Sequence, residues 1–350
     1  MLHGPAAMGE PWQPQPQQQR LPGFGNASEP SAWPSAAGGP GTAAPGGGGT
    51  GAGAGGAVSP WDIALCATGT AVAGENALVL AVLFYTPSLR APMFLLIGSL
   101  ALADLLAGLG LVANFAVRYL LRPPSEAAEL GAAGLLLAAF SASVCSLLAI
   151  TVDRYLSLYN ALTYHSERTL GFTCAMVLLM WLLCLGVGLL PLLGWNCLRD
   201  QSACSILRPV TKDNAAVLAV TFLLLFALMM QLYLQICKIA FRHAQQIAVQ
   251  HQFIATAQAT STRKGLSTLS LILGTFALCW IPFAIYSLVA DSSYPVVYTY
   301  SLALPATCNS LINPIIYAFR NPDIQKSLWL ACCGCIPSTF SSRPRTSSDV

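Results

Sequence analysis

Long runs of hydrophobic positions dominate the sequence after residue 60. Seven of them, each at least 21 residues long, are separated by short polar segments. They cover 63–84, 93–113, 130–152, 170–195, 214–237, 265–290 and 296–319. A helix needs roughly 20 residues to cross the hydrocarbon core of a membrane, and five of the runs contain no charged residue. Buried helices of a soluble protein would carry polar stripes, so the pattern predicts an all-α membrane protein with a seven-transmembrane helix bundle.

The segments outside these runs predict the rest of the organisation. The first 60 residues are rich in Gln, Pro, Gly and Ala and hold too little apolar surface to form a core, which predicts disorder. Residues 322–330 have the pattern of a short amphipathic eighth helix on the membrane surface. We therefore expect a disordered extracellular tail over 1–60, the bundle over 61–320, a surface helix with a cysteine cluster over 321–335, and a disordered cytoplasmic tail over 336–350.

Composition and charge narrow the class of protein. Hydrophobic residues make up 55% of the chain and charged residues 9%, against roughly a quarter charged in a soluble domain. This disfavours a soluble enzyme, and a net charge of +3 offers no basic surface for nucleic acid. With the N-terminus outside, eleven of the 17 Lys and Arg residues fall on the inner side and six on the outer. The positive-inside rule then predicts a multi-pass plasma-membrane protein with an extracellular N-terminus, where the sequon at Asn26 meets the glycosylation machinery.

Several polar residues interrupt the spans, where an ionisable group is costly and marks a functional hypothesis. Glu75 and Asp104 lie near the middle of the first and second spans, and Asp153-Arg154-Tyr155 ends the third. The remaining signals are Asn76, Trp181, Trp280 with Pro282, and Asn309 with Asn313-Pro314 and Tyr317. Each has an ordinary structural explanation when taken alone. Their order along the chain carries more information than any one of them.

That order resembles the rhodopsin-like (class A) family of G-protein-coupled receptors over residues 61–335. Within the family, segments 143–159, 214–239 and 343–350 resemble a subgroup of constitutively active orphan receptors, numbered three, six and twelve. Segments 164–168 and 197–200 are most similar to one member of it. The resemblance implies a receptor, not an enzyme, that raises cyclic AMP through the heterotrimeric stimulatory G protein without added ligand.

The resemblance also assigns a switch at the inner end of the bundle. Arg154, released from Asp153, would meet the backbone carbonyls of the G-protein tail, because a guanidinium offers five fixed donors. Tyr233 and Tyr317 would then close in beneath it. The other residues assigned to the switch are Tyr155, Asn313 and Pro314.

One departure from many relatives concerns this switch. An acid at the inner end of the sixth span pairs there with the arginine, whereas residues 260–265 contain no acid and two bases, Arg263 and Lys264. Holding the active state to one molecule in a hundred takes about 2.7 kcal/mol. Turning a desolvated ion pair into a like-charge contact shifts such a balance by roughly 1–3 kcal/mol. The sequence therefore predicts high signalling without ligand.

A polar network deeper in the bundle matches the sodium pocket that favours the inactive state in relatives. Its members are Asn76, Asp104, Ser143, Asn309 and Ser310. The alternative is a protonated Asp104 that is hydrogen-bonded to Asn313. We expect no cofactor apart from this sodium ion.

The residues that face the predicted ligand pocket are almost wholly apolar. They are Leu136, Leu137, Phe140, Trp280, Phe283, Ala284, Ser287, Ala303 and Thr307. Leu136 stands where amine receptors place an acid. Such a cavity favours an acyl chain or another lipid, of lysophospholipid type, over a charged transmitter. The alternative is that these side chains simply pack the bundle and bind no regulatory ligand.

The cysteines and the tail complete the predictions. Cys197 and Cys204 lie in one outer loop, where an oxidising compartment favours a bridge between them over free thiols. Cys332, Cys333 and Cys335 follow the surface helix and are candidate palmitoyl sites, with unmodified thiols as the alternative. The Ser- and Thr-rich tail suits receptor kinases and arrestin. The remaining alternative for the whole chain is a membrane transporter, although no repeat of broken helices supports one.

Overall fold

The computed structural model describes residues 58–333 apart from 122, 124, 160–169, 251–254 and 292, and omits the side chains of 88, 244, 247–250, 255–265, 318, 319, 322 and 331–333. Its elements are α1 (Pro60–Tyr85), η1 (Pro87–Leu89), α2 (Pro92–Tyr119), α3 (Glu126–Tyr159), α5 (Leu170–Leu189), η2 (Gln201–Ala203), α6 (Lys212–Gln250), α7 (Ala255–Val289), α8 (Val296–Arg320) and α9 (Pro322–Cys333). Each predicted span corresponds to one long helix, and α9 corresponds to the predicted surface helix. The seven-helix bundle with a short eighth helix is confirmed.

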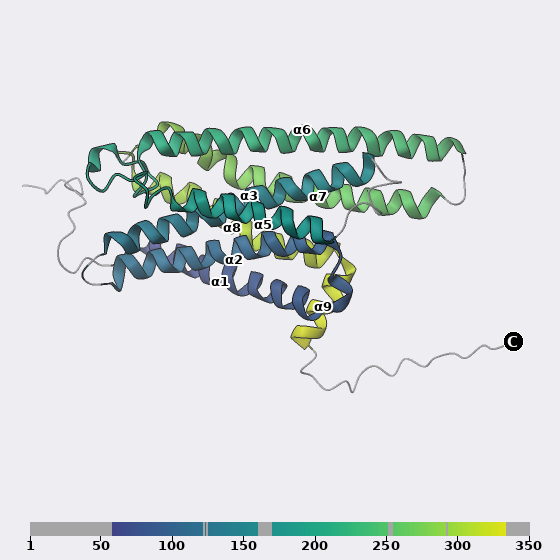
Figure 1. Ribbon diagram of the computed structural model, residues 1–350, viewed down its shortest axis with the longest axis horizontal. Coiled ribbons are helices and arrows are strands. Elements are labelled where there is room, and N and C mark those ends of the chain that lie inside the picture. The colour runs from purple at the N-terminus through teal and green to yellow at the C-terminus, as the bar shows by residue number, and fades with distance from the viewer. Residues whose placement is uncertain are drawn as a thin grey trace, which may run out of the picture. The chain divides into compact units, whose positions relative to one another are not determined.

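The long helices form a closed bundle. Contacts run from α1 to α2, from α2 to α3, from α3 to α5 and α6, from α6 to α7, from α7 to α8, and from α8 back to α1. Figure 1 shows these helices side by side, with α6 and α7 projecting beyond the others at the end where α9 lies. The short α9 packs against α1 and α8.

Local sequence explains where several helices begin. Prolines occupy the first turns of α1 and α2, where a missing backbone N–H costs nothing. The Ser125 hydroxyl accepts a 3.4 Å hydrogen bond from the Ala128 N–H at the start of α3. The Asn321 side chain accepts from the Asp323 N–H at 3.0 Å and so separates α9 from α8.

Several helix boundaries differ from the hydrophobic runs, and two of them show why. The fourth run reaches residue 195, but α5 ends at Leu189, because Pro191 disfavours further helix and Gly194 has φ of 115°. The fifth run ends at 237, but α6, the helix that corresponds to it, continues to Gln250. Helical geometry does not stop at the membrane surface, since backbone hydrogen bonds within the helix persist in water.

Helix α8 shows how polar residues enter the bundle. By length and composition, six helices in the described part of the chain suit a membrane span, and α8 is not among them. It carries several polar side chains and two internal prolines, Pro305 and Pro314. Asn309, Ser310 and Asn313 are nevertheless at most 8% exposed, because they point into the bundle rather than toward lipid.

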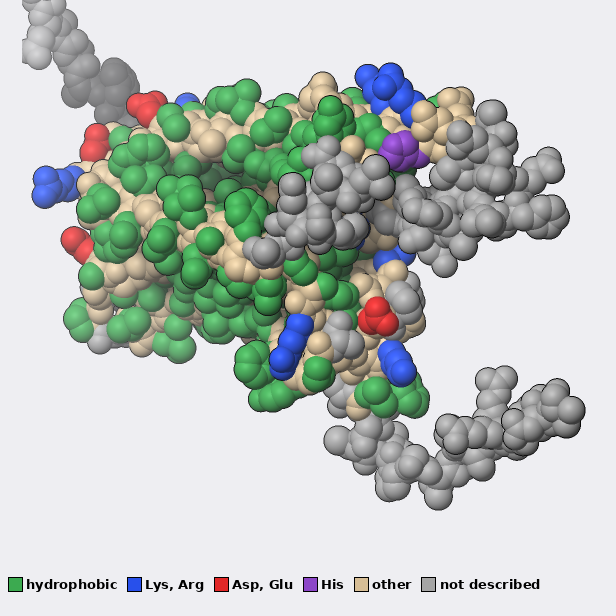
Figure 2. All heavy atoms as spheres, turned by 45° about the vertical axis from the view of Figure 1, so that its right-hand side comes forward, with side chains coloured by type: hydrophobic (Ala, Val, Ile, Leu, Met, Phe, Trp, Pro, Cys, Tyr) green, Lys and Arg blue, Asp and Glu red, His purple; other side chains and the backbone are tan. Residues whose placement is uncertain are grey.

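The outer surface of the bundle is apolar. Figure 2 shows hydrophobic side chains over most of the face between the two ends, with charged side chains gathered toward those ends. Glu75 is an exception that the sequence singled out, because it lies exposed on α1 whereas its neighbour Asn76 is fully buried. Of the two acids near mid-span, only Asp104 therefore belongs to the interior.

Close helix contacts depend on glycine at two places. A Cβ on Gly108 of α2 would lie 2.5 Å from the carbonyl oxygen of Gly69 on α1. A Cβ on Gly188 of α5 would lie 2.7 Å from both the Gly134 carbonyl oxygen and the Ala138 Cβ of α3. Small residues let these backbones approach, as is common between helices in membranes.

Candidate functional site

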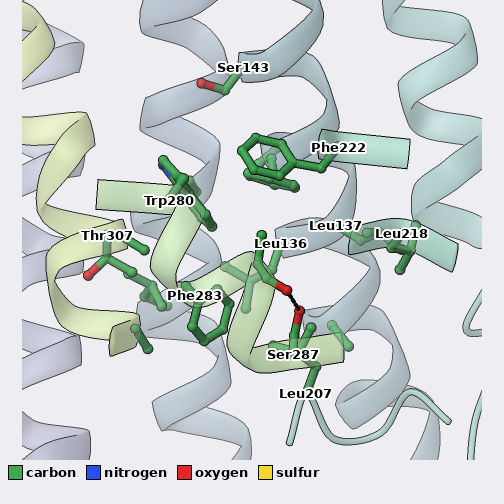
Figure 3. Close-up of a pocket in the computed structure, with 18 of the residues that line it drawn as sticks. Leu136, Leu137, Ser143, Leu207, Leu218, Phe222, Trp280, Phe283, Ser287 and Thr307 are labelled. Carbon is green, nitrogen blue, oxygen red and sulfur yellow. Dashed lines mark hydrogen bonds between the residues drawn. The ribbon is translucent and has the colours of Figure 1, made fainter. Parts of the chain in front are cut away.

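One cavity of about 280 Å³ opens between α3, α6, α7 and α8 and extends to α1 and α2. The nine residues that the sequence assigned to a ligand pocket all line it. Figure 3 shows Leu136, Phe222, Trp280 and Phe283 converging on the same space. Phe140 and Trp280 pack with ring centroids 4.3 Å apart, which fixes the indole in the middle of the cavity wall.

The two ends of the cavity differ in charge. Leu207, Arg208 and Val210 of the loop between α5 and α6 line its outer end. Asp104 lines the opposite end, together with Ser143. The predicted apolar pocket and the predicted polar network thus border one continuous space, which sequence reasoning treated as two separate sites.

The hydroxyl groups in this wall are already engaged. Ser287 Oγ donates to the Ala284 carbonyl at 2.7 Å, as the dashed line in Figure 3 marks. Thr307 Oγ1 donates to the Leu304 carbonyl at 2.8 Å. Each hydroxyl hydrogen is therefore used within its own helix, and the middle of the cavity offers an apolar surface.

Asp104 lies at the centre of the polar network and is 1% exposed. Its carboxylate accepts hydrogen bonds from Ser143 Oγ at 3.3 Å, Ser310 Oγ at 2.9 Å and Asn313 Nδ2 at 2.9 Å. Asn76 Nδ2 donates to the Ser310 carbonyl at 3.1 Å. Four helices, α1, α2, α3 and α8, are joined through this group.

The network suits a small monovalent cation. Asn76 Oδ1, Asn309 Nδ2 and Asn313 Oδ1 are buried without a hydrogen-bond partner within the described residues. The two amide oxygens could contact a cation or accept from ordered water, whereas the Asn309 amide N–H needs an acceptor such as ordered water. One carboxylate among neutral oxygens favours a singly charged ion, and no cluster of three His, Cys, Asp or Glu side chains occurs in the described part of the chain.

At the inner end, the predicted switch residues lie on four helices, α3, α6, α7 and α8. Asp153 is 6% exposed, and Arg154 Nη2 contacts Met93 Sδ at the start of α2. Tyr233 of α6 hydrogen-bonds to Ser270 of α7. Sequence reasoning did not anticipate either contact.

The other switch residues are only partly described. Tyr317 is 4% exposed, and its hydroxyl has no partner within the described residues. Arg263 and Lys264 belong to α7, but their side chains lie outside the description.

The outer loop covers the cavity as a pinned lid. The predicted Cys197–Cys204 disulfide is confirmed. The Cys197 N–H donates to the Pro209 carbonyl at 2.7 Å, and the Ser205 N–H donates to the Val210 carbonyl at 3.0 Å. These bonds hold the backbone on both sides of Arg208 over the opening.

A carboxylate in the next outer loop joins this lid to the bundle. Asp291 forms a β-bridge with Ser205, and its carboxylate lies 3.6 Å from Lys212 Nζ. Hydrogen bonds from Ser293, followed by the charge of Lys212, lower the pKa of Asp291. In the lid itself, hydrogen bonds from Ser202 lower the pKa of Asp200. Both acids are therefore ionised at neutral pH.

Sequence reasoning missed a second charged cluster at the outer end of the bundle. Asp62 of α1 accepts from Tyr119 of α2 at 2.6 Å and from Tyr300 of α8 at 2.5 Å. Arg118 Nη1 lies 3.3 Å from the same carboxylate, and Trp61 stacks on Tyr300. The only sign of this cluster in the sequence was Asp62, an acid in the first turn of an apolar helix. A favourable interaction with the helix N-terminus explains such an acid equally well.

The sequence singled out Trp181 but did not indicate which residues it contacts. Its Nε1 donates to Ser99 Oγ at 3.0 Å, and Ser99 Oγ lies 2.9 Å from Ser146 Oγ. The three side chains join α5, α2 and α3.

Some predicted sites lie beyond the description. Asn26 and Cys335 fall outside the described residues, as does the tail over 336–350. Cys332 and Cys333 belong to α9, and their side chains lie outside the described part of the chain.

The fold and the ordered motifs together define the class of protein. The family model described as 7 transmembrane receptor (rhodopsin family) matches residues 75–317. The chain belongs to this family of G-protein-coupled receptors, whose members are not enzymes, and membership replaces the transporter alternative.

Three curated relatives refine that placement. The chain is 66% identical to G-protein coupled receptor 12 of Mus musculus over 84% of its own length and 87% of that receptor. It is 54% identical to G-protein coupled receptor 6 of Rattus norvegicus, covering 84% and 80% of the two chains. It is 53% identical to G-protein coupled receptor 3 of Rattus norvegicus, covering 83% and 88%. These are the three receptors of the subgroup that the sequence segments indicated.

Proposed function

We propose that this receptor signals constitutively, coupling to the stimulatory G protein and raising cyclic AMP without added ligand. The observation that carries the proposal is the inner segment of α7, where residues 260–265 hold Arg263 and Lys264 and no acid. An inactive bundle that lacks an α7 carboxylate for Arg154 loses one contribution to its stability. A change of roughly 1–3 kcal/mol is enough to turn a trace of active receptor into a substantial share.

The proposed mechanism is a two-state equilibrium. In the active state the inner end of α7 moves outward, Arg154 turns from Asp153 to the carbonyls of the G-protein tail, and Tyr233 and Tyr317 follow. Tyr233 must leave Ser270 to do so, because its hydroxyl is engaged there. Ser270 thus opposes the switch in the conformation described.

A lipid is the ligand class that the cavity supports best. Its wall consists almost entirely of apolar side chains, and the hydroxyls of Ser287 and Thr307 are committed to their own helices. A charged transmitter would lose its hydration there without compensation. An acyl chain would instead gain apolar contact. The ligand acts only through its different affinities for the two states.

A sodium ion completes the proposal at the inner end of the cavity. Asp104, Ser143, Ser310 and Asn309 would hold it. The ion would supply a positive charge that balances Asp104 and stabilises the inactive bundle. In this arrangement the four side chains orient toward one another and keep α2, α3 and α8 together.

The cellular setting follows from the same class. We place the receptor in the plasma membrane with its N-terminus outside and Asn26 glycosylated. Cys332, Cys333 and Cys335 would carry palmitoyl chains beside α9, and the tail would bind receptor kinases and arrestin. Each of these rests on sequence pattern and on the family.

A panel of G proteins tests the coupling. Membranes that contain the wild-type receptor or Arg154→Ala are assayed for nucleotide exchange with no ligand added. We expect wild type to activate the stimulatory G protein above membranes without receptor, and Arg154→Ala to return the rate to that background. Equal rates in all three samples, or activation of another G protein alone, would sink the proposal.

A further inference from the structure

Arg208 is the one cationic side chain that lines the cavity, according to the described residues. It lies in the lid, is exposed, and has no carboxylate partner among those residues. Its backbone is fixed by the bonds of Cys197 to Pro209 and of Val210 to Leu207 at 2.9 Å. The loop therefore presents a guanidinium at the mouth of an otherwise apolar space.

We propose that Arg208 binds the anionic head of a single-chain lipid whose tail occupies the cavity. This assignment rests on the proposed lipid pocket and adds the charge and the orientation of the ligand. The head group is a carboxylate or a phosphate, both of which a guanidinium binds through parallel N–H donors.

The hydrogen-bonding inventory of the wall supports this assignment. Ser143 and Ser310 donate to Asp104, and Ser287 and Thr307 donate to backbone carbonyls. Apart from the neutral indole N–H of Trp280, which lies between apolar neighbours, Arg208 alone among the lining side chains has hydrogens free for an anion. A buried anion without donors would be strongly disfavoured.

Electrostatics fix which way the lipid lies. Asp104 lines the opposite end of the cavity and accepts the hydrogens of Ser143 and Ser310, so an anion would find no free donor there. The apolar stretch around Leu136, Phe222 and Trp280 separates the two charges and accepts the chain. The head therefore stays at the lid, in contact with water, and the chain points toward Asp104.

A series of lipids with one chain and different heads tests the proposal. Palmitate, hexadecyl phosphate and hexadecanol are titrated into purified full-length receptor, and affinity is taken from the shift of the thermal unfolding midpoint. We expect the two anions to bind wild type about tenfold more tightly than the alcohol, as a charge-assisted hydrogen bond predicts. The relative affinities of palmitate and hexadecyl phosphate distinguish the two head groups.

Matched variants separate the anchor from the pocket. Arg208→Gln should remove the preference for anions and leave hexadecanol binding unchanged, and Arg208→Lys should restore part of it. Arg199→Gln, an exposed arginine of the same loop that does not line the cavity, should behave like wild type. Salt should weaken palmitate binding to wild type but not to Arg208→Gln.

Two results would overturn the proposal. They differ in whether they also contradict the lipid pocket on which it rests. If the lipids bind but Arg208→Gln and Arg199→Gln have equal effects, the anchor is wrong and the lipid pocket stands. If no lipid raises the unfolding midpoint of the wild type more than that of Ala284→Phe, whose larger side chain fills the cavity, then both the lipid pocket and the anchor are wrong.

Discussion

Three donors from α3 and α8 converge on the carboxylate of Asp104, and the amide oxygens of Asn76 and Asn313 have no hydrogen-bond partner within the described residues. A cation bound beside the Asp104 carboxylate would contact these oxygens and stabilise the cluster. Because the ion would stabilise the inactive arrangement of α2, α3 and α8, its binding should lower the basal activity of the receptor.

We expect sodium to lower the basal activity of wild type, and Asp104→Asn to abolish that dependence. Nucleotide exchange is measured in membranes while sodium replaces potassium at constant ionic strength, and a several-fold fall is expected for wild type. Glu75→Gln is the control, since that acid is exposed on α1. A wild-type rate that sodium leaves unchanged would contradict the sodium site.

Asp62 makes a second prediction at this scale. Asp62→Asn weakens the acceptor of two tyrosine hydroxyls and removes the charge beside Arg118, so the variant should unfold at a lower temperature. A loss of about 1–3 kcal/mol is expected for a buried group of this kind. Asp213→Asn, on an exposed acid at the start of α6, serves as the control. Equal midpoints for the two variants would show that the cluster does not stabilise the bundle.

Single residues were predictable where a charge stood in an apolar run. Asp104 was singled out in this way, and Ser143, Ser310 and Asn313 donate hydrogen bonds to it. Tyr119, Tyr300 and Arg118 were not found, because residues near helix ends have ordinary interfacial roles and their shared contact with Asp62 depends on how α1, α2 and α8 meet. The contact of Arg154 with Met93 was not predictable for the same reason, because it depends on how α3 and α2 pack together.

Elements were predictable because the hydrocarbon core imposes a length. Seven runs became seven helices, since backbone groups in lipid must be satisfied within the helix. The helix ends were less predictable. Helix α5 stops at Leu189 although its apolar run continues, and α6 extends past Cys237, where its own apolar run ends. Hydrophobicity reports where the membrane is, whereas proline and backbone hydrogen bonds decide where a helix ends.

The contact between α3 and α5 depends on the absence of side chains. Gly188→Val should lower the unfolding midpoint, because its Cβ would lie 2.7 Å from atoms of Gly134 and Ala138. Overpacking of this kind costs roughly 1–3 kcal/mol. Gly186→Val lies two residues away on α5 with nothing within 4 Å of its Cβ, and it carries the same change in helix propensity. The idea fails if both variants unfold together.

At the scale of the whole molecule, the bundle has an outer half that encloses a cavity and an inner half that contains the predicted switch residues. The cavity wall and the Asp104 network meet, so a ligand and a cation would bias one equilibrium from adjacent places. The family could be predicted from the order of motifs, whereas the continuity of the two sites could not. It depends on the packing of small side chains between α2, α3 and α8.

Basal cyclic AMP in cells expressing Thr262→Glu tests the central claim most directly, with Thr262→Gln as an uncharged variant of the same shape. Glutamate would supply the acid that residues 260–265 lack and would pair with Arg154 in the inactive state. We expect high basal cyclic AMP in wild type and Thr262→Gln, and a several-fold fall in Thr262→Glu at equal surface expression. Wild-type output no higher than that of empty cells, or equal output from the two variants, would contradict the account.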